Sequence, residues 1–496
     1  MQSKNITNSR PFIISFIIAI SIYLIYIYTI LSAPDATHLK HYAVSDLTDI
    51  QGSNPQNDKL MKIITNSHCG RFPMLTDLNV SDTNWQVTNT TNGTFYLLNA
   101  YFDDREALKN QSVVRILALI NRIDASLKAY CQFWYEGMNE PIPVEVQQYL
   151  MIWPKYWGTN DKGAGPYLIT CPNPLSNVSL VPQFVSFVEH ECGNANNILE
   201  IRNKRPKNGH KEKFLISVKS LDFQNDISLL LVEWCEMLKI FGVNKVEIFI
   251  VNAHPNVIRV LKMYQAENLV TIKFLKFPHE LPNKASQSWQ QWTQNDLVPY
   301  HDSFYENLYL YEYMIPMDVD EFIVPRHTED RTWSDLLSRT IEKSKVKNET
   351  FDAFPAMNMY FVLKSVHENE TIPGIPKNLR FLSNIYRAAN FTPNGGNAKT
   401  FMRLDRIVTV HNHFPFSCFD TGHCKLFDIH PEDGHLAHYR TDCDNPECKL
   451  AKPNPTKDTT LWKYKDELLG NVKAALERLK QFKTDIDVEP LDIRLE

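Results

Sequence analysis

The chain has 496 residues, of which 43% are hydrophobic and 22% are charged, and its formal net charge is -5. This length is sufficient for two or three domains with substantial cores, and the composition is that of a globular protein rather than a disordered or fibrous one. Proteins that bind nucleic acid usually carry a basic face or stripe, so this charge balance predicts no nucleic-acid partner.

The first informative segment is residues 11–33, which contain no charged residue and are rich in Ile, Leu, Phe and Tyr. A helix of this length spans the roughly 30 Å hydrocarbon core of a bilayer. The alternative is a cleaved signal peptide, whose apolar region runs for only about 7 to 15 residues. Pro34 also makes a poor cleavage position. We therefore predict a cytoplasmic tail at 1–10 and an uncleaved transmembrane anchor at 11–33.

Charge on the two sides of this anchor predicts its orientation. Lys4 and Arg10 precede it, whereas Asp35, Lys40, Asp46 and Asp49 follow it, and the more positive side stays in the cytoplasm. The rest of the chain is then lumenal, as in a single-pass type II protein. The number of N-glycosylation sequons after the anchor agrees with this orientation. They begin at Asn79, Asn89, Asn92, Asn110, Asn177, Asn348, Asn369 and Asn390.

Cysteine usage also indicates an oxidising compartment. The nine cysteines are Cys69, Cys131, Cys171, Cys192, Cys235, Cys418, Cys424, Cys443 and Cys448. In a lumenal chain they predict several disulfides with one cysteine left over, although the sequence does not determine the pairing. The alternative for the last four cysteines is a zinc site that includes nearby histidines, but their spacing misses the usual C-x2-C pattern.

Beyond the anchor, the composition changes several times along the chain. Residues 34–93 are polar and weakly periodic, which predicts a flexible stem. Residues 94–205 contain short apolar runs separated by turn-like clusters, which predict a small β-rich accessory domain. We expect a catalytic α/β domain at 206–450, entered through a solvated basic stretch, and a C-terminal helical tail at 451–496.

The α/β domain begins with alternating strand and helix patterns. Apolar runs at 214–218, 246–251 and 270–275 predict strands, with helices at 226–241 and 255–266 between them. This order predicts right-handed βαβ crossovers and a mostly parallel sheet, which binds nucleotides at the carboxyl ends of its strands. Neither a G-x-G-x-x-G nor a G-x-x-x-x-G-K motif is present, so another group must hold the phosphates.

Asp318-Val319-Asp320 is the strongest candidate for that group, because it ends an apolar strand and is followed by another apolar run. Two carboxylates at a strand end can hold a hard divalent cation, which bridges a diphosphate and neutralises its charge. A D-x-D triplet can also be an ordinary polar strand end. An EF-hand loop requires glycine where this chain has Ile323. The strand context favours the metal site.

Several segments, in this order, together resemble glycosyltransferase family 92. They are 100–105, 216–221, 231–234, 241–243, 317–325 and 438–440, within a resemblance that covers roughly residues 95–445. The family includes an invertebrate enzyme that adds galactose to the core fucose of N-glycans. The resemblance implies a GT-A fold, a type II protein of the Golgi membrane, and inverting transfer from a UDP-sugar, UDP-galactose with Mn2+. One departure is His301-Asp302-Ser303, where family members usually have Asn-Asp-Cys.

Carried over to this chain, the resemblance makes Asp318 and Asp320 ligands of the metal and the donor diphosphate. GT-A enzymes often complete the metal site with a C-terminal histidine, for which His438 is our first choice and His413 our second. The alternative for either is a structural histidine in the core.

Two further roles are open. Lys219 and Asn252, at the ends of the first two predicted strands, are candidates to contact the nucleotide, or are solvated loop residues. An inverting enzyme also needs a general base. The sequence does not identify one; Asp302 and Asp433 are candidates for this base, and each is alternatively a structural or surface acid.

We therefore expect a metal-dependent hexosyltransferase that uses a UDP-sugar and a glycoprotein N-glycan acceptor. The alternative from another class is an inactive lumenal carbohydrate-binding or scaffold protein with the same fold. A cell-surface adhesion protein would share the anchor, sequons and disulfides, but adhesion ectodomains are mostly antiparallel β, unlike the predicted βαβ succession.

Overall fold

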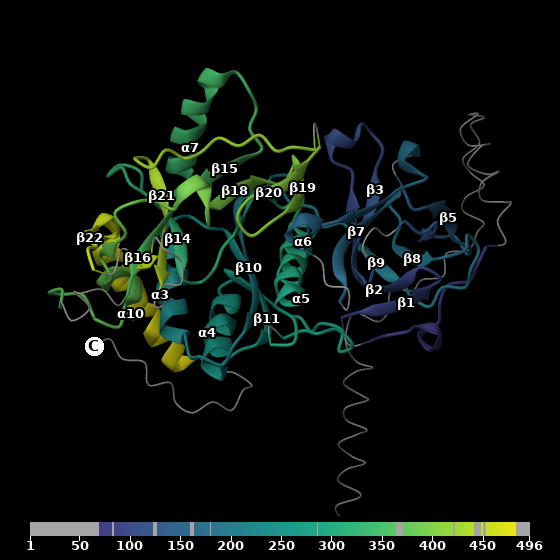
Figure 1. Cartoon of the computed structure of the whole chain (residues 1–496), viewed down its shortest axis with the longest axis horizontal. Coiled ribbons are helices and arrows are strands. Elements are labelled where there is room, and N and C mark those ends of the chain that lie inside the picture. The colour runs from purple at the N-terminus through teal and green to yellow at the C-terminus, as the bar shows by residue number, and fades with distance from the viewer. Residues whose placement is uncertain are drawn as a thin grey trace, which may run out of the picture. The chain divides into compact units, whose positions relative to one another are not determined.

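A computed structural model describes residues 69–81, 84–122, 126–158, 163–178, 180–284, 286–363, 371–419, 422–440, 448–449 and 453–482. These residues belong to one compact unit, Asn66–Glu496, with a mixed α/β fold (Figure 1). The expected α/β class is confirmed. None of the helices in the described ranges is long and apolar enough to cross a membrane, and the predicted anchor at 11–33 lies outside those ranges.

The N-terminal part is a large sheet in which most strand pairs are antiparallel. Its strands are β1 (Gln86–Thr90), β2 (Gly93–Asp103), β3 (Val113–Ile120), β4 (Tyr130–Trp134), β5 (Ile142–Glu145), β6 (Gln148–Met151), β7 (Gly165–Pro172), β8 (Phe184–Val188) and β9 (Leu199–Arg202). The path is β5-β4-β8-β9-β2-β3-β7-β6, with β1 paired to β2. Strand β3 is buried along its whole length, as expected for the uninterrupted apolar run that forms it.

The expected flexible stem is wrong at its C-terminal end. Strand β1 lies within 34–93 yet pairs in register with β2, and Cys69 is joined to Cys192 by a disulfide. The physical reason is a pair of apolar residues at alternate positions, Trp85 and Val87. They lie within an otherwise polar stretch of sequence, and both side chains are buried in the core. The Trp85 indole also donates a hydrogen bond to the Lys276 carbonyl, 2.6 Å away.

The second part is a six-stranded sheet in the order β12-β11-β10-β13-β18-β15. Its first four strands are parallel and its last two pairs are antiparallel. The strands are β10 (Glu212–Asp222), β11 (Lys245–Asn252), β12 (Val270–Phe274), β13 (Tyr311–Pro316), β18 (Lys399–Arg403) and β15 (Ala353–Ala356). Helices α3 (Ser228–Ile240) and α4 (Pro255–Ala266) provide the crossovers, which confirms the predicted βαβαβ unit. Helix α3 is followed by Gly242 at φ +82°, a left-handed conformation that favours glycine.

The two faces of this sheet enter different hydrophobic clusters. Phe214, Ile216 and Val218 of β10 pack with α3 and α4, whereas Leu215 joins a cluster with α6 (Leu297–Glu306) and the N-terminal sheet. Side chains alternate along a strand, so one strand contributes to both clusters. Because the second cluster contains residues of β2 and β3 as well as β10 and β13, the two sheets share a core.

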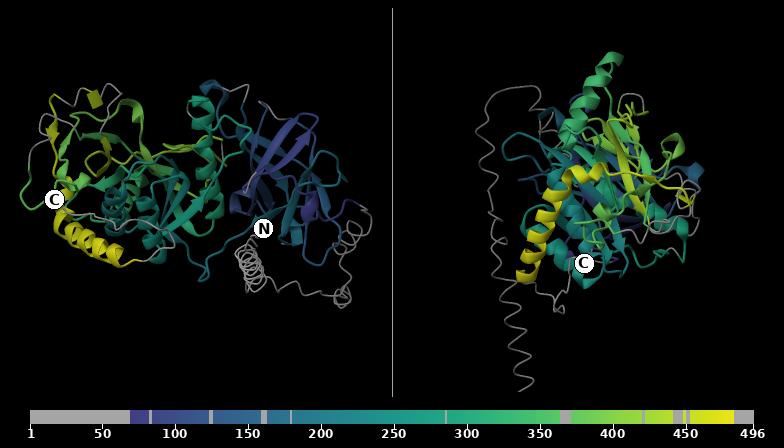
Figure 2. Two further views of the ribbon diagram at one scale, coloured as in Figure 1. Left: turned by 90° about the horizontal axis from the view of Figure 1, so that it is seen from below. Right: turned by 90° about the vertical axis from the view of Figure 1, so that its left-hand side faces the viewer.

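The predicted C-terminal helical tail at 451–496 does contain a helix, but that helix packs into the core of the preceding domain. Helix α10 (Lys465–Gln481) lies against α3 and buries Leu468, Val472, Ala475, Leu476 and Leu479 (Figure 2). This spacing produces one apolar stripe, which needs a partner surface. The helix is therefore part of the core on the α3 face of the sheet.

A third sheet, in the order β14-β21-β16-β17-β22, adjoins the parallel one. Its strands are β14 (Glu321–Pro325), β21 (Gly434–Arg440), β16 (Asn358–Val362), β17 (Tyr386–Arg387) and β22 (Thr456–Lys457). The remaining elements include the hairpin β19 (Ile407–Val410) and β20 (Pro415–Cys418), and helices α5 (Trp289–Asn295), α7 (Trp333–Ser344) and α8 (Arg380–Ser383).

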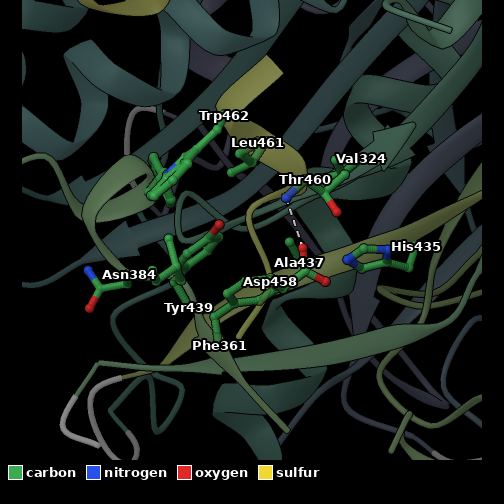
Figure 3. Close-up of a pocket in the computed structure, with 12 residues that line it drawn as sticks. Val324, Phe361, Asn384, His435, Ala437, Tyr439, Asp458, Thr460, Leu461 and Trp462 are labelled. Atoms are coloured by element: carbon green, nitrogen blue, oxygen red, sulfur yellow. Dashed lines mark hydrogen bonds between the residues drawn. The ribbon is translucent and has the colours of Figure 1, made fainter. Parts of the chain in front are cut away.

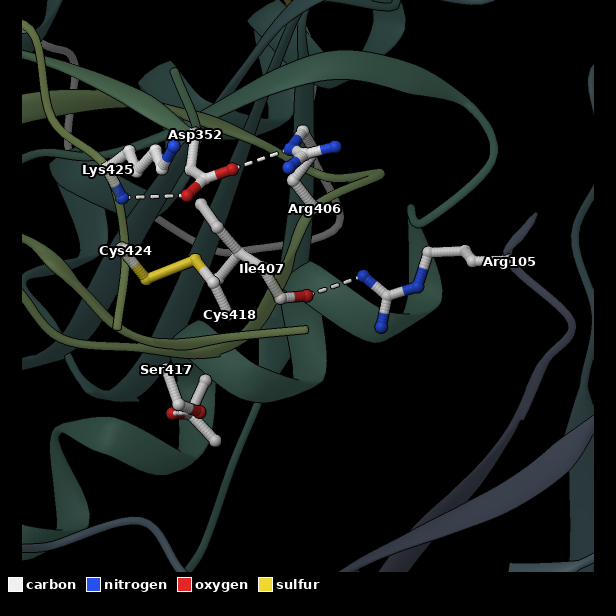
Figure 4. Close-up of a disulfide and its surroundings, with 9 residues drawn as sticks. Arg105, Asp352, Arg406, Ile407, Ser417, Cys418, Cys424 and Lys425 are labelled. Atoms are coloured by element: carbon white, nitrogen blue, oxygen red, sulfur yellow. Dashed lines mark hydrogen bonds and ion pairs between the residues drawn. A yellow bond between two sulfur atoms is a disulfide. The ribbon is translucent and has the colours of Figure 1, made fainter. Parts of the chain in front are cut away.

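Cysteine pairing agrees with an oxidising compartment. Disulfides join Cys69 to Cys192, Cys131 to Cys171 and Cys418 to Cys424, and Cys448 is also disulfide-bonded. In the described ranges, Cys235 is a free thiol and is buried. The predicted disulfides with one cysteine left over are confirmed. Cys418 and Cys424 lie near Asp352, but the disulfide removes the thiolates that a zinc site needs (Figure 4).

A buried ion cluster connects the first sheet to the β19–β20 hairpin. Asp103, fully buried at the end of β2, accepts hydrogen bonds from Arg105 and Arg115 at 2.8–2.9 Å. Burial alone would raise the pKa of Asp103, but the two guanidinium groups hold it below its usual range. Arg105 also donates to the carbonyls of Leu404 and Ile407 at 2.6 and 2.5 Å.

We expect Asp103→Ala to lower the free energy of unfolding by about 3–5 kcal/mol, because two buried arginines lose their counter-ion. Asp104→Ala is the matched control, since the Asp104–Arg205 pair is 40% exposed on both sides and should change stability by about 0.5 kcal/mol or less. Chemical denaturation measures both. Equal shifts in the two variants would contradict the prediction.

Candidate active site

Asp318-Val319-Asp320 forms the connection between two sheets. Strand β13 of the parallel sheet ends at Pro316, and β14 of the third sheet begins at Glu321. β13 runs parallel to β10, so the loop lies at the carboxyl ends of these strands, where Lys219 of β10 also lies. The Glu321 carboxylate accepts a hydrogen bond from the Asp318 backbone N–H at 2.9 Å, which closes the turn.

Asp318 is directed toward two lysines. Its carboxylate lies 3.2 Å from Lys399 Nζ and 3.9 Å from Lys219 Nζ. Burial would raise the pKa of Asp318, but the two ammonium groups reverse the effect and keep it well below the usual range. Asp318 in turn raises the pKa of Lys219. This carboxylate is therefore ionised, and both lysines are charged at any physiological pH.

Lys399 is the most constrained of these groups. Its side chain is fully buried, and Nζ lies 2.8 Å from Glu321 and 2.6 Å from the Asn412 side-chain oxygen, in addition to Asp318. Burial opposes its charge, while Asp318 and Glu321 favour it and raise the pKa of Lys399 overall. A buried ammonium requires such partners.

Asp320 faces a different partner, His438. Oxygens of Asp320 and Glu321 and a ring nitrogen of His438 lie within 4.8 Å of one another, which is compatible with a metal ion. His438 is directly opposite Glu321 in the antiparallel register of β14 and β21. Strand pairing therefore brings together residues separated by more than one hundred positions in the sequence.

The two nitrogens of His438 have different surroundings. Nδ1 lies 3.2 Å from the Asn358 side-chain oxygen and 3.4 Å from Glu321, so both can accept its proton. Nε2 is buried, has no hydrogen-bond partner among the described residues, and lies 3.8 Å from Asp320. An acceptor at one ring nitrogen orients the other as a metal ligand. Asp320 and His438 therefore fit a divalent metal, which would supply positive charge for a diphosphate.

The other expected site residues are distributed more widely. His413 Nδ1 donates a hydrogen bond to the Ala398 carbonyl, 3.0 Å away, and burial lowers the pKa of His413 to about 3. Lys219 does join the Asp318 group and also pairs with Asp296 at 3.2 Å. Asn252 is exposed at the end of β11, and its side-chain oxygen accepts a hydrogen bond from Gln224.

Asp302, one of the two candidate general bases, lies in a separate buried cluster. It accepts hydrogen bonds from Asn99 at 2.6 Å, from Lys273 at 2.9 Å and from the Tyr101 hydroxyl. Within the described ranges, no contact joins it to the Asp318–Asp320 loop. Tyr300, two residues earlier in α6, contacts Asn412 instead. Residues two apart point to roughly opposite sides of a helix. The placement of Asp302 favours the structural alternative.

Two other positions behave structurally. Asp433 is buried and pairs with Lys343 and with His327, which lies 2.8 Å away. His301, at the position where the family usually has Asn, is fully buried, and its Nε2 accepts a hydrogen bond from the Val410 N–H at 3.2 Å. His301 thereby connects α6 to β19.

A small pocket lies behind the site, on the other face of β21. His435 and Tyr439 line it, together with Asp458 and Trp462 (Figure 3). Burial lowers the pKa of His435 to about 4, and neither of its ring nitrogens has a hydrogen-bond partner among the described residues. Because alternate residues of a strand face opposite sides, this pocket is separated from His438 by the strand itself.

Sequence reasoning missed Lys399, Asn358 and Asn412. Lys399 begins a five-residue strand whose sequence has no distinctive motif, Asn358 is a single polar residue between two methionines, and Asn412 lies between two histidines. Glu321 lies within the segment 317–325 that carries the family resemblance, but no separate role was predicted for it. Its position directly after D-x-D was the one available signal.

The model of glycosyltransferase family 92 matches residues 212–472, more than half of the chain. The chain belongs to glycosyltransferase family 92. The match begins at β10 and ends within α10, so it contains the Asp318–Asp320 loop, Lys399 and His438. No curated protein matches the chain. Membership supports a glycosyltransferase and implies a nucleotide-sugar donor.

The candidate metal site at Asp320 and His438 can be tested by measuring Mn2+ binding to the full-length protein. We expect His438→Ala and Asp320→Asn to weaken binding by at least tenfold, because each removes a candidate ligand. Asn358→Ala should weaken it by about 10- to 100-fold through loss of histidine orientation. His430→Ala, whose side chain is 59% exposed, is the matched control. Electron paramagnetic resonance of free Mn2+ measures the affinity, and identical affinities in all four variants would rule out this site.

Proposed function

We propose that this protein is a metal-dependent, inverting hexosyltransferase of the GT-A type. Its donor is a UDP-sugar, namely UDP-galactose, and its metal is Mn2+. Its acceptor is a residue of a glycan, such as the core fucose of a glycoprotein N-glycan. In the reaction, an acceptor hydroxyl gives its proton to a general base as its oxygen bonds to the anomeric carbon, while the bond from that carbon to the diphosphate breaks and UDP leaves with the electron pair. The galactose and core-fucose identities come from family resemblance.

The observation that carries the proposal is the arrangement at the carboxyl ends of β10 and β13. Asp320 and His438 fit a divalent cation, while Lys219 and Lys399 place two further positive charges beside Asp318. A leaving nucleoside diphosphate gains negative charge as its bond to the sugar breaks. In many enzymes, fixed positive groups directed at such developing charge make the largest single contribution to transition-state stabilisation.

We further propose that the protein is a single-pass type II protein of the Golgi membrane, anchored through residues 11–33. Exposure of the sequons supports a lumenal location for the folded part. The side chains of Asn79, Asn89, Asn110, Asn177, Asn348 and Asn390 are exposed. Together with the disulfides, they suit a chain that folds in the secretory pathway.

Donor turnover tests the catalytic proposal. With Mn2+, we expect the full-length protein to release UDP from one member of a UDP-sugar panel, most rapidly UDP-galactose, and a chelator to abolish release. Asp320→Asn should reduce turnover by about a hundredfold or more, because the metal contributes several kcal/mol of charge stabilisation. Asp405→Asn is the matched acid-to-amide control, since that side chain is 47% exposed and pairs only with nearby Arg403 among its described ion pairs.

The result also distinguishes the alternative of an inactive carbohydrate-binding protein. Folded protein that binds a core-fucosylated N-glycan but releases no UDP from any donor, with or without that glycan, would support the binding protein and overturn the enzyme. Turnover that is insensitive to both the chelator and Asp320→Asn would overturn the metal-dependent mechanism.

A further inference from the structure

The turn between β19 and β20 lies against the candidate active site on one side. Asn412 in this turn accepts hydrogen bonds from Lys399 at 2.6 Å and from the Tyr300 hydroxyl at 2.9 Å. The Thr400 hydroxyl also donates to the His413 carbonyl at 2.6 Å. Since Lys399 is paired with Asp318, only two side-chain contacts separate this turn from the D-x-D loop.

On its other side, the same turn contacts aromatic residues from the N-terminal sheet. The ring of Trp157, in the connection from β6 to β7, lies 4.8 Å from the His411 ring and 5.7 Å from the Phe416 ring. Phe414 lies 4.8 Å from His411 and stacks on Phe416 at 6.1 Å. Tyr156 lies 5.9 Å from Trp157. We call Tyr156, Trp157, His411, Phe414 and Phe416 the aromatic surface.

The aromatic surface is accessible and without formal charge. Tyr156 is 81% exposed, and the other four side chains are partly exposed. Burial, together with the nearby Lys399 charge, lowers the pKa of His411 to about 4, so its ring is neutral at lumenal pH. A tyrosine this exposed contributes little to folding, because its apolar ring remains in water.

Both sides of the aromatic surface are held in place. The Trp153 indole donates to the Gly158 carbonyl at 2.8 Å, and Gln291 of α5 exchanges two hydrogen bonds with the Ala164 backbone at 2.7 and 2.8 Å. The hairpin is held at its base by the Cys418–Cys424 disulfide and by Arg105 at the Ile407 carbonyl (Figure 4). A pre-organised surface loses little conformational entropy on binding.

We propose that the aromatic surface binds the acceptor as a neutral oligosaccharide and directs its reactive hydroxyl toward the Asp318–Asp320 loop. This inference rests on the proposed transferase function. Pyranose rings present C–H groups on one face, which pack on aromatic rings, while their hydroxyls hydrogen-bond at the edge. The neutral imidazole of His411 can exchange such hydrogen bonds. Continuity with Asn412 and Lys399 favours a substrate over an unrelated protein partner.

The proposal also assigns a role to the N-terminal sheet. The residues that hold the metal and the diphosphate belong to β10–β21, but Tyr156 and Trp157 come from the connection between β6 and β7. The family match begins at residue 212 and does not contain that connection. Acceptor choice is then determined partly outside the matched region.

Binding of a fluorescently labelled, core-fucosylated neutral N-glycan to the full-length protein, with Mn2+ and UDP present, tests the proposal. We expect Tyr156→Ala to raise the Kd by about tenfold, the scale of one truncated contact residue. Trp157→Ala should raise it further, and Trp157→Phe should restore part of the affinity. Phe72→Ala is the matched control, because Phe72 is 47% exposed and packs on Trp134 and Phe184 at another part of the same sheet.

UDP-sugar hydrolysis in the absence of acceptor separates this proposal from the proposed function. We expect the Tyr156→Ala and Trp157→Phe variants to retain the wild-type hydrolysis rate, with only the acceptor Kd and KM raised. An unchanged Kd in Tyr156→Ala and Trp157→Ala, or no binding of the glycan to the wild type, would overturn the aromatic surface as the acceptor site. No UDP release by the wild type from any donor, with or without the acceptor glycan, would instead overturn the transferase itself.

Discussion

The active-site architecture depends on one buried positive charge. Lys399 is fully removed from water, and its ammonium group is compensated by Asp318, Glu321 and the Asn412 oxygen. These three partners come from the D-x-D loop, the first residue of β14 and the β19–β20 turn. A buried charge requires its partners, so Lys399 must stay close to all three. This requirement keeps the two sheets and the hairpin in one arrangement. The same contacts separate the roles of the two acids, Asp318 toward the lysines and Asp320 toward His438.

The N-terminal sheet is joined to this arrangement by apolar packing and by charge. Its β2 and β3 share a hydrophobic cluster with β10, β13 and α6. Asp302 and Lys273 form a buried pair between the sheets, and Arg105 reaches the carbonyls beneath the hairpin. A region that is loosely attached could not hold a substrate contact precisely, whereas one that shares a core can. This shared core fixes the region near Trp157 relative to the site on the other sheet, as the proposed acceptor site requires.

Local patterns were sufficient for much of the fold. The βαβαβ unit from β10 to β12 follows from apolar runs, Pro255 at the first turn of α4 and Gly242 after α3, since each signal acts within a few residues. The predicted boundaries of the stem and of the C-terminal tail were wrong because the contacts that decide them are not local. Trp85 and the apolar stripe of α10 look isolated in polar sequence, and their burial depends on surfaces that are distant along the chain.

By itself, the sequence determined the class of the fold, the D-x-D acids, the presence of several disulfides with one cysteine left over, and the family. It also suggested His438 through resemblance. Only the tertiary structure decided that Glu321 lies opposite His438, that Lys399 compensates Asp318, that Asp302 is buried elsewhere, and that Trp157 meets the β19–β20 turn. The physical reason is the separation of these residues in the sequence. Strand register and buried charge pairing join residues tens to hundreds of positions apart, and no local propensity encodes such a pairing.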